Sequence, residues 1–193
     1  MRSVPAACFL GMNFHGNYQL LDDPKIQIGQ PEVKVGLLPG GGGTQRLPRV
    51  LGVEAALNMM VSGEPVKSEL LAQLPGQKLF DKLSASVESL AEEAIAFAQS
   101  IAAVRPLPLV RNLPCKHPLG DAYFGFAGNM VKGMSKNYPA PMKCVEAVIA
   151  ATKQKFDVGM RIERDPSRLA EPFDVVVIGG GITGVNVARE ASG

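Results

Sequence analysis

Apolar and polar positions alternate along the chain before and after Gln30-Pro31. A period of two is typical of short, half-buried strands, so two strands are predicted here. The alternating apolar positions are Ile26 and Ile28 before Pro31, and Val33, Val35 and Leu37 after it.

The alternation ends at Pro39 and the four glycines Gly40 to Gly43. A helical spacing follows, for which Thr44 is the predicted N-cap, and it ends near Ser62-Gly63. The apolar positions of this predicted helix are Leu47, Val50, Leu51, Leu57 and Met60.

Three further helices are predicted from apolar positions that recur every three or four residues. They carry Val87, Leu90, Ala94, Phe97 and Ile101, then Tyr123, Phe126, Met130 and Met134, and finally Met142, Val145, Val148 and Ile149 after Pro141. All three stripes are interpreted as core-facing, because plain helix packing explains them without a ligand. Residues 105–118 contain four prolines and are predicted to form an extended connector.

Composition narrows the class of protein. The chain has 193 residues, 46% of them hydrophobic, which suits one packed domain. A net charge of +2 favours neither nucleic acid nor a membrane surface as partner, so a small molecule is expected. Cys8, Cys115 and Cys144 lack the spacing of a disulfide framework or a metal site. Without an apolar run of about 18 residues, no membrane span is predicted, and we expect a cytoplasmic protein.

Glu32 lies eight residues before the glycine run. A carboxylic acid beside closely approaching backbone can move a proton while amide N–H groups hold a developing negative charge. On these residues alone, a solvated glutamate next to a bend is the more common explanation of the pattern. A phosphate-binding loop is excluded, because Gln45 and not lysine follows Thr44.

The stretch "IGQPEVKVGLLPGGGGTQRLPRVLGVEAALNMMVSG" (residues 28–63) resembles the enoyl-CoA hydratase/isomerase (crotonase) family. Residues 106–164, including "DAYFGFAGNMVKGMSKNYPAPMKCVEAVIAATKQKFDVGMRIER", resemble the hydratase domain of bifunctional fatty-acid β-oxidation enzymes. The resemblance implies an α/β fold, a partial spiral of ββα turns dominated by helices. It also implies an acyl-CoA substrate, no cofactor for the hydratase reaction, and a homo-oligomer, trimeric or hexameric.

The same resemblance assigns two site residues. Glu32 matches the glutamate that gives or takes a proton at the substrate's α-carbon, and Gly40 matches the turn against the catalytic water. Family hydratases carry a further glutamate and an oxyanion N–H about twenty residues earlier. Phe9 and Met12 stand at those places, no acid occurs in residues 1–21, and His15 is not adopted as a substitute base. The family's earlier strands are also missing, so an impaired activity is expected.

The C-terminal segment "FDVVVIGGGITGVNVARE" (residues 173–190) has a different pattern. Gly179, Gly181 and Gly184 follow a strand-like run with the spacing of a dinucleotide-binding turn. The segment resembles the N-terminus of flavin-dependent oxidoreductases of the glycerol-3-phosphate dehydrogenase type, which implies FAD. It stops before the second strand, so a truncated Rossmann-type β-turn-α fragment that binds no nucleotide by itself is expected.

The predicted organisation is a hydratase-like domain over residues 1–164, a linker over 165–172 and the nucleotide-binding fragment over 173–193. The leading hypothesis is an enoyl-CoA hydratase/isomerase-like protein of fatty-acid β-oxidation. Two alternatives stay open: a catalytically inert, fused or truncated product that binds a partner through helix faces, and a fragment of an FAD-dependent oxidoreductase.

Overall fold

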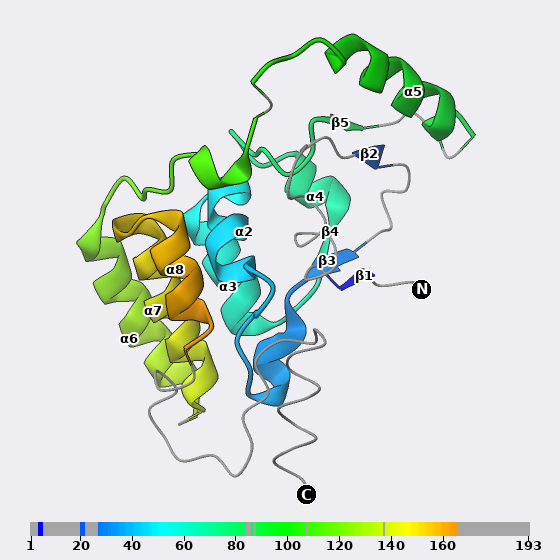
Figure 1. Ribbon diagram of the computed structural model, residues 1–193. Helices are drawn as coiled ribbons and strands as arrows, with labels where there is room; N and C mark the ends of the chain where they lie inside the picture. Colours follow the sequence, from blue (N-terminus) through cyan, green and yellow to red (C-terminus); the bar gives the residue numbers. More distant parts are fainter. Residues whose placement is uncertain are drawn as a thin grey trace, which may run out of the picture.

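The computed structural model describes residues 4–5, 20–21 and 27–165, apart from 84–85, 87, 107 and 137. Short strands and a larger set of helices make up this part of the chain (Figure 1). The strands are β1 (Val4–Pro5), β2 (Leu20–Leu21), β3 (Gln27–Gly29), β4 (Val66–Lys67) and β5 (Lys82–Leu83). The helices are η1 (Pro31–Val35), α2 (Gly43–Leu51), α3 (Val53–Ser62), α4 (Ser68–Ala72), α5 (Leu90–Ile101), η2 (Val110–Asn112), α6 (Asp121–Met134), α7 (Pro139–Lys153) and α8 (Phe156–Glu163). The predicted helix-dominated α/β class is confirmed.

Two small sheets accompany the helices. Strand β3 lies between β1, to which it is parallel, and β4, to which it is antiparallel. Strands β2 and β5 pair in parallel. The first predicted strand is therefore confirmed at Ile28, which pairs with Val66 and is buried.

The second predicted strand is wrong, because Pro31–Val35 forms the 3-10 helix η1. Proline suits the first turn of a helix, and Gly36 ends this one in the left-handed region at φ +78°. Val33 is buried, whereas Val35 is 73% exposed. The alternating sequence therefore does not correspond to two faces of a sheet.

The long helix predicted from Thr44 is two helices separated at Gly52, whose φ of +86° interrupts the helical geometry. The predicted end near Ser62-Gly63 is confirmed, since α3 ends at Ser62 and Gly63 closes it at φ +63°. Thr44 is not the N-cap. Gly42 occupies that position, and Thr44 lies inside the first turn of α2 with its side chain fully buried.

The core forms where α2, α3 and α7 pack together. Each large apolar side chain buried there contributes about 1.5–3 kcal/mol to the free energy of folding, so this contact stabilises the described part of the chain. The fully or nearly fully buried apolar side chains of these helices include Leu47, Leu57, Met60, Val145 and Val148. The predicted core-facing side of the last helix is confirmed at Val145 and Val148.

Helix α6 packs on α7 through a different face from the predicted one. Its buried residues are Phe124, Ala127 and Val131. Of the predicted stripe, only Tyr123 is partly buried, stacked on His117 with ring centroids 3.8 Å apart. Phe126, Met130 and Met134 are exposed by 64%, 46% and 70%. Both stripes are apolar, and the one that contains the small Ala127 is the one that packs on α7.

Helix α5 projects away from the helical bundle beside β5 (Figure 1). None of its residues is buried, and Ile95 is 61% exposed. The predicted stripe residues Leu90, Ala94 and Phe97 are its half-buried side. The stripe exists, but it does not join the core of the described residues.

Helix α8 was not predicted, because it is short and has Gly159 in its interior. That glycine is needed for packing. A Cβ at Gly159 would lie 2.6 Å from Cδ of Gln45 and closer still to its Oε1. Helix α8 therefore approaches α2 closely, and this contact brings the end of α8 to the glycine turn.

Candidate functional site

The glycine turn, residues 40–43, leads directly into α2. Gly42 has φ +87°, a region that favours glycine. A Cβ at this position would lie 2.8 Å from Cζ of Arg46 and closer still to its Nη1. The guanidinium cannot move freely, because Nη1 donates a 2.7 Å hydrogen bond to the Gly41 carbonyl. Glycine at 42 is therefore required by both the backbone and the packing.

Gly43 is required for a second close approach. A Cβ here would lie 2.9 Å from Cβ of Pro39 and closer still to Nε2 of Gln30. The Gln30 side chain is fully buried, and neither its amide nitrogen nor its oxygen has a hydrogen-bond partner within the described residues. A buried polar group without a partner carries a desolvation cost, so this amide marks a polar spot beside the turn.

Glu32 lies in η1, two residues after Gln30, and is half-buried. Its Oε2 atom is buried and has no hydrogen-bond partner among the described residues. Burial raises the pKa of Glu32, and a hydrogen bond from its own backbone lowers it by less. The side chain therefore does not extend into bulk solvent.

Gly40 lies in the turn between Pro39 and α2 and is half-buried. Residues 33–39 separate Gly40 from Glu32, the other predicted site residue, along the sequence. Their assigned roles stay predictions, which the geometry neither requires nor opposes.

Glu163, at the end of α8, is the acid that holds the glycine turn. Its side chain is 2% exposed. Oε1 accepts a 2.7 Å hydrogen bond from the Gly42 amide, and Oε2 accepts one of 3.1 Å from the Thr44 amide and another from the Thr44 hydroxyl. The carboxylate thus satisfies amides at the start of α2 that have no partner within the helix.

Burial raises the pKa of Glu163 to about 7, and the three hydrogen bonds lower it only in part. Sequence reasoning missed this residue, because a glutamate in "RIERDP" has no motif around it. The only available signal was its place at the end of a segment that resembles the family.

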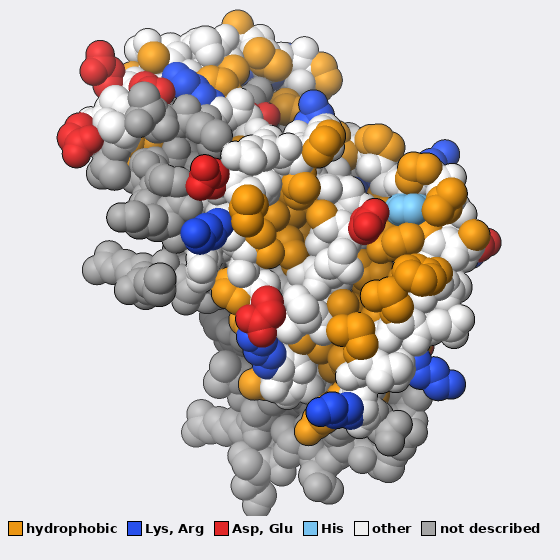
Figure 2. Space-filling view, turned by 180° about the vertical axis from the view of Figure 1, so that it is seen from behind, with side chains coloured by type: hydrophobic (Ala, Val, Ile, Leu, Met, Phe, Trp, Pro, Cys, Tyr) orange, Lys and Arg blue, Asp and Glu red, His pale blue; other side chains and the backbone are white. Residues whose placement is uncertain are grey.

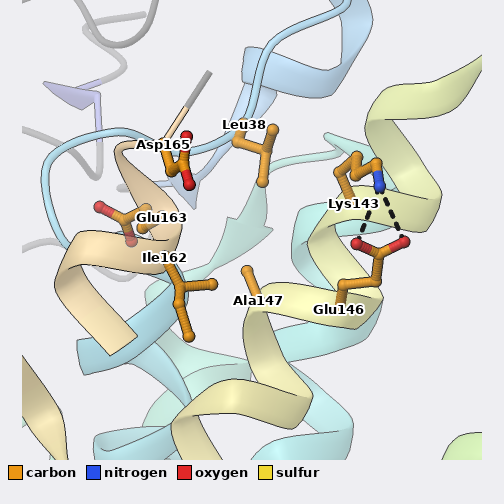
Figure 3. A pocket seen from close by; sticks show the side chains of 7 residues that line it. All are labelled: Leu38, Lys143, Glu146, Ala147, Ile162, Glu163 and Asp165. Carbon is orange, nitrogen blue, oxygen red and sulfur yellow. Dashed lines mark hydrogen bonds and ion pairs between the residues drawn. The ribbon is translucent and has the colours of Figure 1, made fainter. Parts of the chain in front are cut away.

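A shallow pocket opens beside Glu163 (Figure 3). A volume of about 10 Å³ is available to the centre of a water molecule, which corresponds to roughly one water. Neither Glu32 nor Gly40 lines it. The pocket is lined by Leu38, Lys143, Glu146, Ala147, Ile162, Glu163 and Asp165, and Lys143 and Glu146 form an ion pair of 2.9 Å at its side.

Cys144 on α7 is the thiol influenced by both acids. It is fully buried, and burial raises its pKa to about 12, with smaller contributions from the charges of Glu32 and Glu163. A thiol with this pKa stays protonated at neutral pH and is a packing residue rather than a nucleophile. Among the described residues, no cluster of His, Cys, Asp and Glu could hold a metal ion.

Three arginines surround the ring of Phe156 on α8. The guanidinium carbons of Arg46, Arg49 and Arg111 lie 5.3, 5.2 and 5.3 Å from its centroid. Arg49 also donates to the carbonyls of Gln45 and Ala151, which join α2 to α7. These contacts fix α8 against α2 and so determine where Glu163 lies.

Several residues that the sequence brings into question for a site lie outside the described residues. They are Phe9, Met12 and His15 near the start of the chain, and the glycines Gly179, Gly181 and Gly184 with the linker before them. The FAD-type turn therefore stays a prediction from the sequence alone. In the part of the chain that the structure covers, no helix has the length and hydrophobicity needed to cross a bilayer.

The sequence matches a family model over about half of its length. The model of enoyl-CoA hydratase/isomerase matches residues 10–111. The chain belongs to the enoyl-CoA hydratase/isomerase family. The match does not reach residues 173–190, so it gives the flavin hypothesis no support.

Solved structures with similarity to the chain include two enoyl-CoA hydratases and a carnitinyl-CoA dehydratase. Enoyl-CoA hydratase subunit I from Geobacillus kaustophilus is 24% identical, with 77% of this chain and 43% of that chain covered and a TM-score of 0.40. Enoyl-CoA hydratase from Bacillus anthracis is 21% identical, with 80% of this chain and 45% of that chain covered and a TM-score of 0.40. A carnitinyl-CoA dehydratase from Mycobacterium avium is 22% identical, with 72% of this chain and 50% of that chain covered and a TM-score of 0.40. The chain spans at most half the length of these relatives, and the family assignment rests on the sequence match and not on these superpositions.

Proposed function

We propose that the chain binds an acyl-CoA thioester beside the glycine turn and that Glu32 exchanges a proton with the α-carbon of a 2-enoyl-CoA. The observation that carries this proposal is the buried, unpartnered Oε2 of Glu32. A carboxyl oxygen without a protein partner is available to a ligand. Family membership supports the thioester as that ligand, in the hydration and isomerisation reactions of fatty-acid β-oxidation.

The chemistry assigns one step to Glu32. Adding water across the α,β double bond places hydroxyl on the β-carbon and a proton on the α-carbon. Glu32 delivers that proton and regains one from the water whose hydroxyl joins the β-carbon. Its raised pKa keeps a larger protonated fraction near neutral pH than an exposed glutamate has. The intermediate enolate carries a negative charge, for which one backbone N–H donor is worth about 3 kcal/mol.

The rate is expected to be low. By family resemblance, Phe9 and Met12 occupy the places of one oxyanion N–H segment and a second glutamate. The second glutamate that the family places on the water has no counterpart at these positions, so we expect slower activation of the water. The proposal is therefore an acyl-CoA-binding protein with impaired hydratase or isomerase activity.

The test uses purified full chain and crotonyl-CoA, followed by the ultraviolet absorbance of the conjugated enoyl thioester. We expect slow loss of this absorbance, abolished in Glu32→Gln. Glu64→Gln is the control, because Glu64 is an exposed acid that pairs with Lys34, which lies in η1 together with Glu32. Absence of both turnover and CoA binding in the unmodified protein would remove the proposal.

A second candidate function is partner binding without catalysis. The observation that favours it is the exposed apolar row Phe126, Met130 and Met134 on α6. Hydrophobic side chains gather on the face of the molecule shown in Figure 2. The occupant considered is a second copy of the chain. Light scattering with size-exclusion chromatography tests it, since a monomer unaffected by Met134→Ser contradicts self-association.

A further inference from the structure

Glu163 joins the end of α8 to the glycine turn across most of the chain. Its carboxylate accepts hydrogen bonds from Gly42, 121 residues away, and from Thr44, 119 residues away. A local cap would need only a side chain next to the helix, and Thr44 itself does not provide one. The start of α2 is therefore held by a distant acid.

The turn is fixed from two sides. Arg46 holds the Gly41 carbonyl through Nη1, and Glu163 holds the Gly42 amide that follows it. Gly40, assigned to the thioester site by family resemblance, is the preceding residue of the same turn. Losing either contact allows this backbone to change its dihedral angles, because glycines restrict them least.

We propose that Glu163 is a positioning residue: its carboxylate holds the glycine turn in the arrangement that receives the acyl-CoA thioester, and protonation of that carboxylate releases the turn. This inference rests on the proposed function. The ionised group accepts from two amides and one hydroxyl. A proton on Oε1 competes with the bond from the Gly42 amide, and a proton on Oε2 competes with the bond from the Thr44 amide, whereas the Thr44 hydroxyl can reverse and accept.

Glu163 meets the conditions for such control near neutral pH. Burial raises its pKa to about 7. It lines the pocket shown in Figure 3, which gives water and protons access to an otherwise buried group. The other charged or titratable described groups that face it are Arg46 from α2, Lys143, Cys144 and Glu146 from α7, and Arg164 and Asp165 after α8.

If Glu163 were only a structural cap of α2, different results would be expected. It would keep the turn the same at every pH at which the protein is folded, and substitution would lower stability and ligand binding together. Positioning by an ionised carboxylate predicts a turn that changes with pH while the rest of the fold stays intact.

The first experiment follows the backbone amides of Gly42 and Thr44 by ¹H–¹⁵N NMR in the full chain between about pH 5.5 and 8.5. We expect both amide shifts to titrate with one midpoint near 7 in the unmodified protein. In Glu163→Gln, which mimics the protonated acid, they should not titrate. Glu146→Gln is the matched control, because Glu146 lines the same pocket but bonds Lys143 and not the turn.

The second experiment measures binding of butyryl-CoA, a saturated thioester that does not react, by isothermal titration calorimetry. If only the ionised form binds, the affinity at pH 6 should be about tenfold weaker than the limiting affinity at high pH, since about one tenth of Glu163 is ionised there. Glu163→Gln should bind weakly at both pH values, and Glu146→Gln should follow the unmodified protein.

The outcomes separate the inference from the proposed function. Amides that do not titrate in the unmodified protein overturn the positioning role, whatever CoA does. Amides that titrate while butyryl-CoA binds equally at all pH values overturn control of binding. Titrating amides with no CoA binding at any pH support the hold on the turn and refute the acyl-CoA function.

Discussion

The Glu163 carboxylate accepts a 2.7 Å hydrogen bond from the Gly42 amide, and both groups are buried. This contact links the last described helix to the turn that starts α2. It makes the geometry of the candidate site depend on an acid that is costly to ionise in a buried environment.

Stability should fall as the pH rises through the titration of Glu163. Its folded-state pKa of about 7 lies above the usual 4.5, so the folded state binds more protons between these values. The contribution of protonated Glu163 to the free energy of unfolding is complete below pH 4.5 and is lost as the pH rises through about 7. The difference corresponds to roughly 3 kcal/mol.

Urea unfolding at several pH values checks this, with Glu163→Gln beside the unmodified protein. The variant should be the more stable of the two at about pH 8, by up to roughly 3 kcal/mol, because it avoids the buried charge. A variant destabilised equally at all pH values contradicts the prediction.

Thr44→Val should raise the pKa of Glu163 further, since the Thr44 hydroxyl donates to its carboxylate. A hydrogen bond to a charged group is worth about 1.5–3 kcal/mol, so stability should fall by about this amount above pH 7 and by less in acid. The measurement is urea unfolding at both pH values. Thr152→Val is the control, because that hydroxyl donates to the Ile149 carbonyl of its own helix and not to Glu163. An equal loss from both substitutions would be evidence against the assignment.

Gly42→Ala should destabilise the protein by more than about 1 kcal/mol, because φ is +87° and the new Cβ would meet the Arg46 guanidinium. Gly125→Ala in α6 is the matched control. A Cβ there meets nothing within 4 Å, so this change should stabilise by up to about 1 kcal/mol. Thermal unfolding of both variants decides, and similar shifts in the same direction would refute the prediction.

Phe124→Ala and Phe126→Ala distinguish the two apolar faces of α6. Phe124 is 6% exposed and Phe126 is 64% exposed. The first change should cost about 3–5 kcal/mol, and the second should stay within about 0.5 kcal/mol. Chemical unfolding of the two variants is sufficient, and a large loss from Phe126→Ala would show that its face is covered in solution.

The sequence was enough to predict the class of fold and several elements. The end of α3 near Ser62-Gly63 was predictable because glycine at positive φ ends helices locally. The burial of Ile28 and of Val145 and Val148 on α7 was also predictable from local sequence, because the spacing of apolar positions indicates which side of a strand or helix is buried. The family was predictable from the amino-acid sequence of residues 28–63.

Other features depended on packing between distant segments. Two apolar stripes run along α6, and only the fold decided that Phe124, Ala127 and Val131 pack while Phe126, Met130 and Met134 remain exposed. The apparent strand at Val33 and Val35 is a 3-10 turn, because Pro31 and Gly36 fit its two ends.

The sequence by itself determined that an acid, Glu32, precedes the glycine run by a few residues, because motif and spacing are local properties. Which acid holds that run was decided only in three dimensions. Glu163 reaches it because Gly159 allows α8 to lie against α2, and a carboxylate buried there has its ionisation set by surroundings contributed from separate helices.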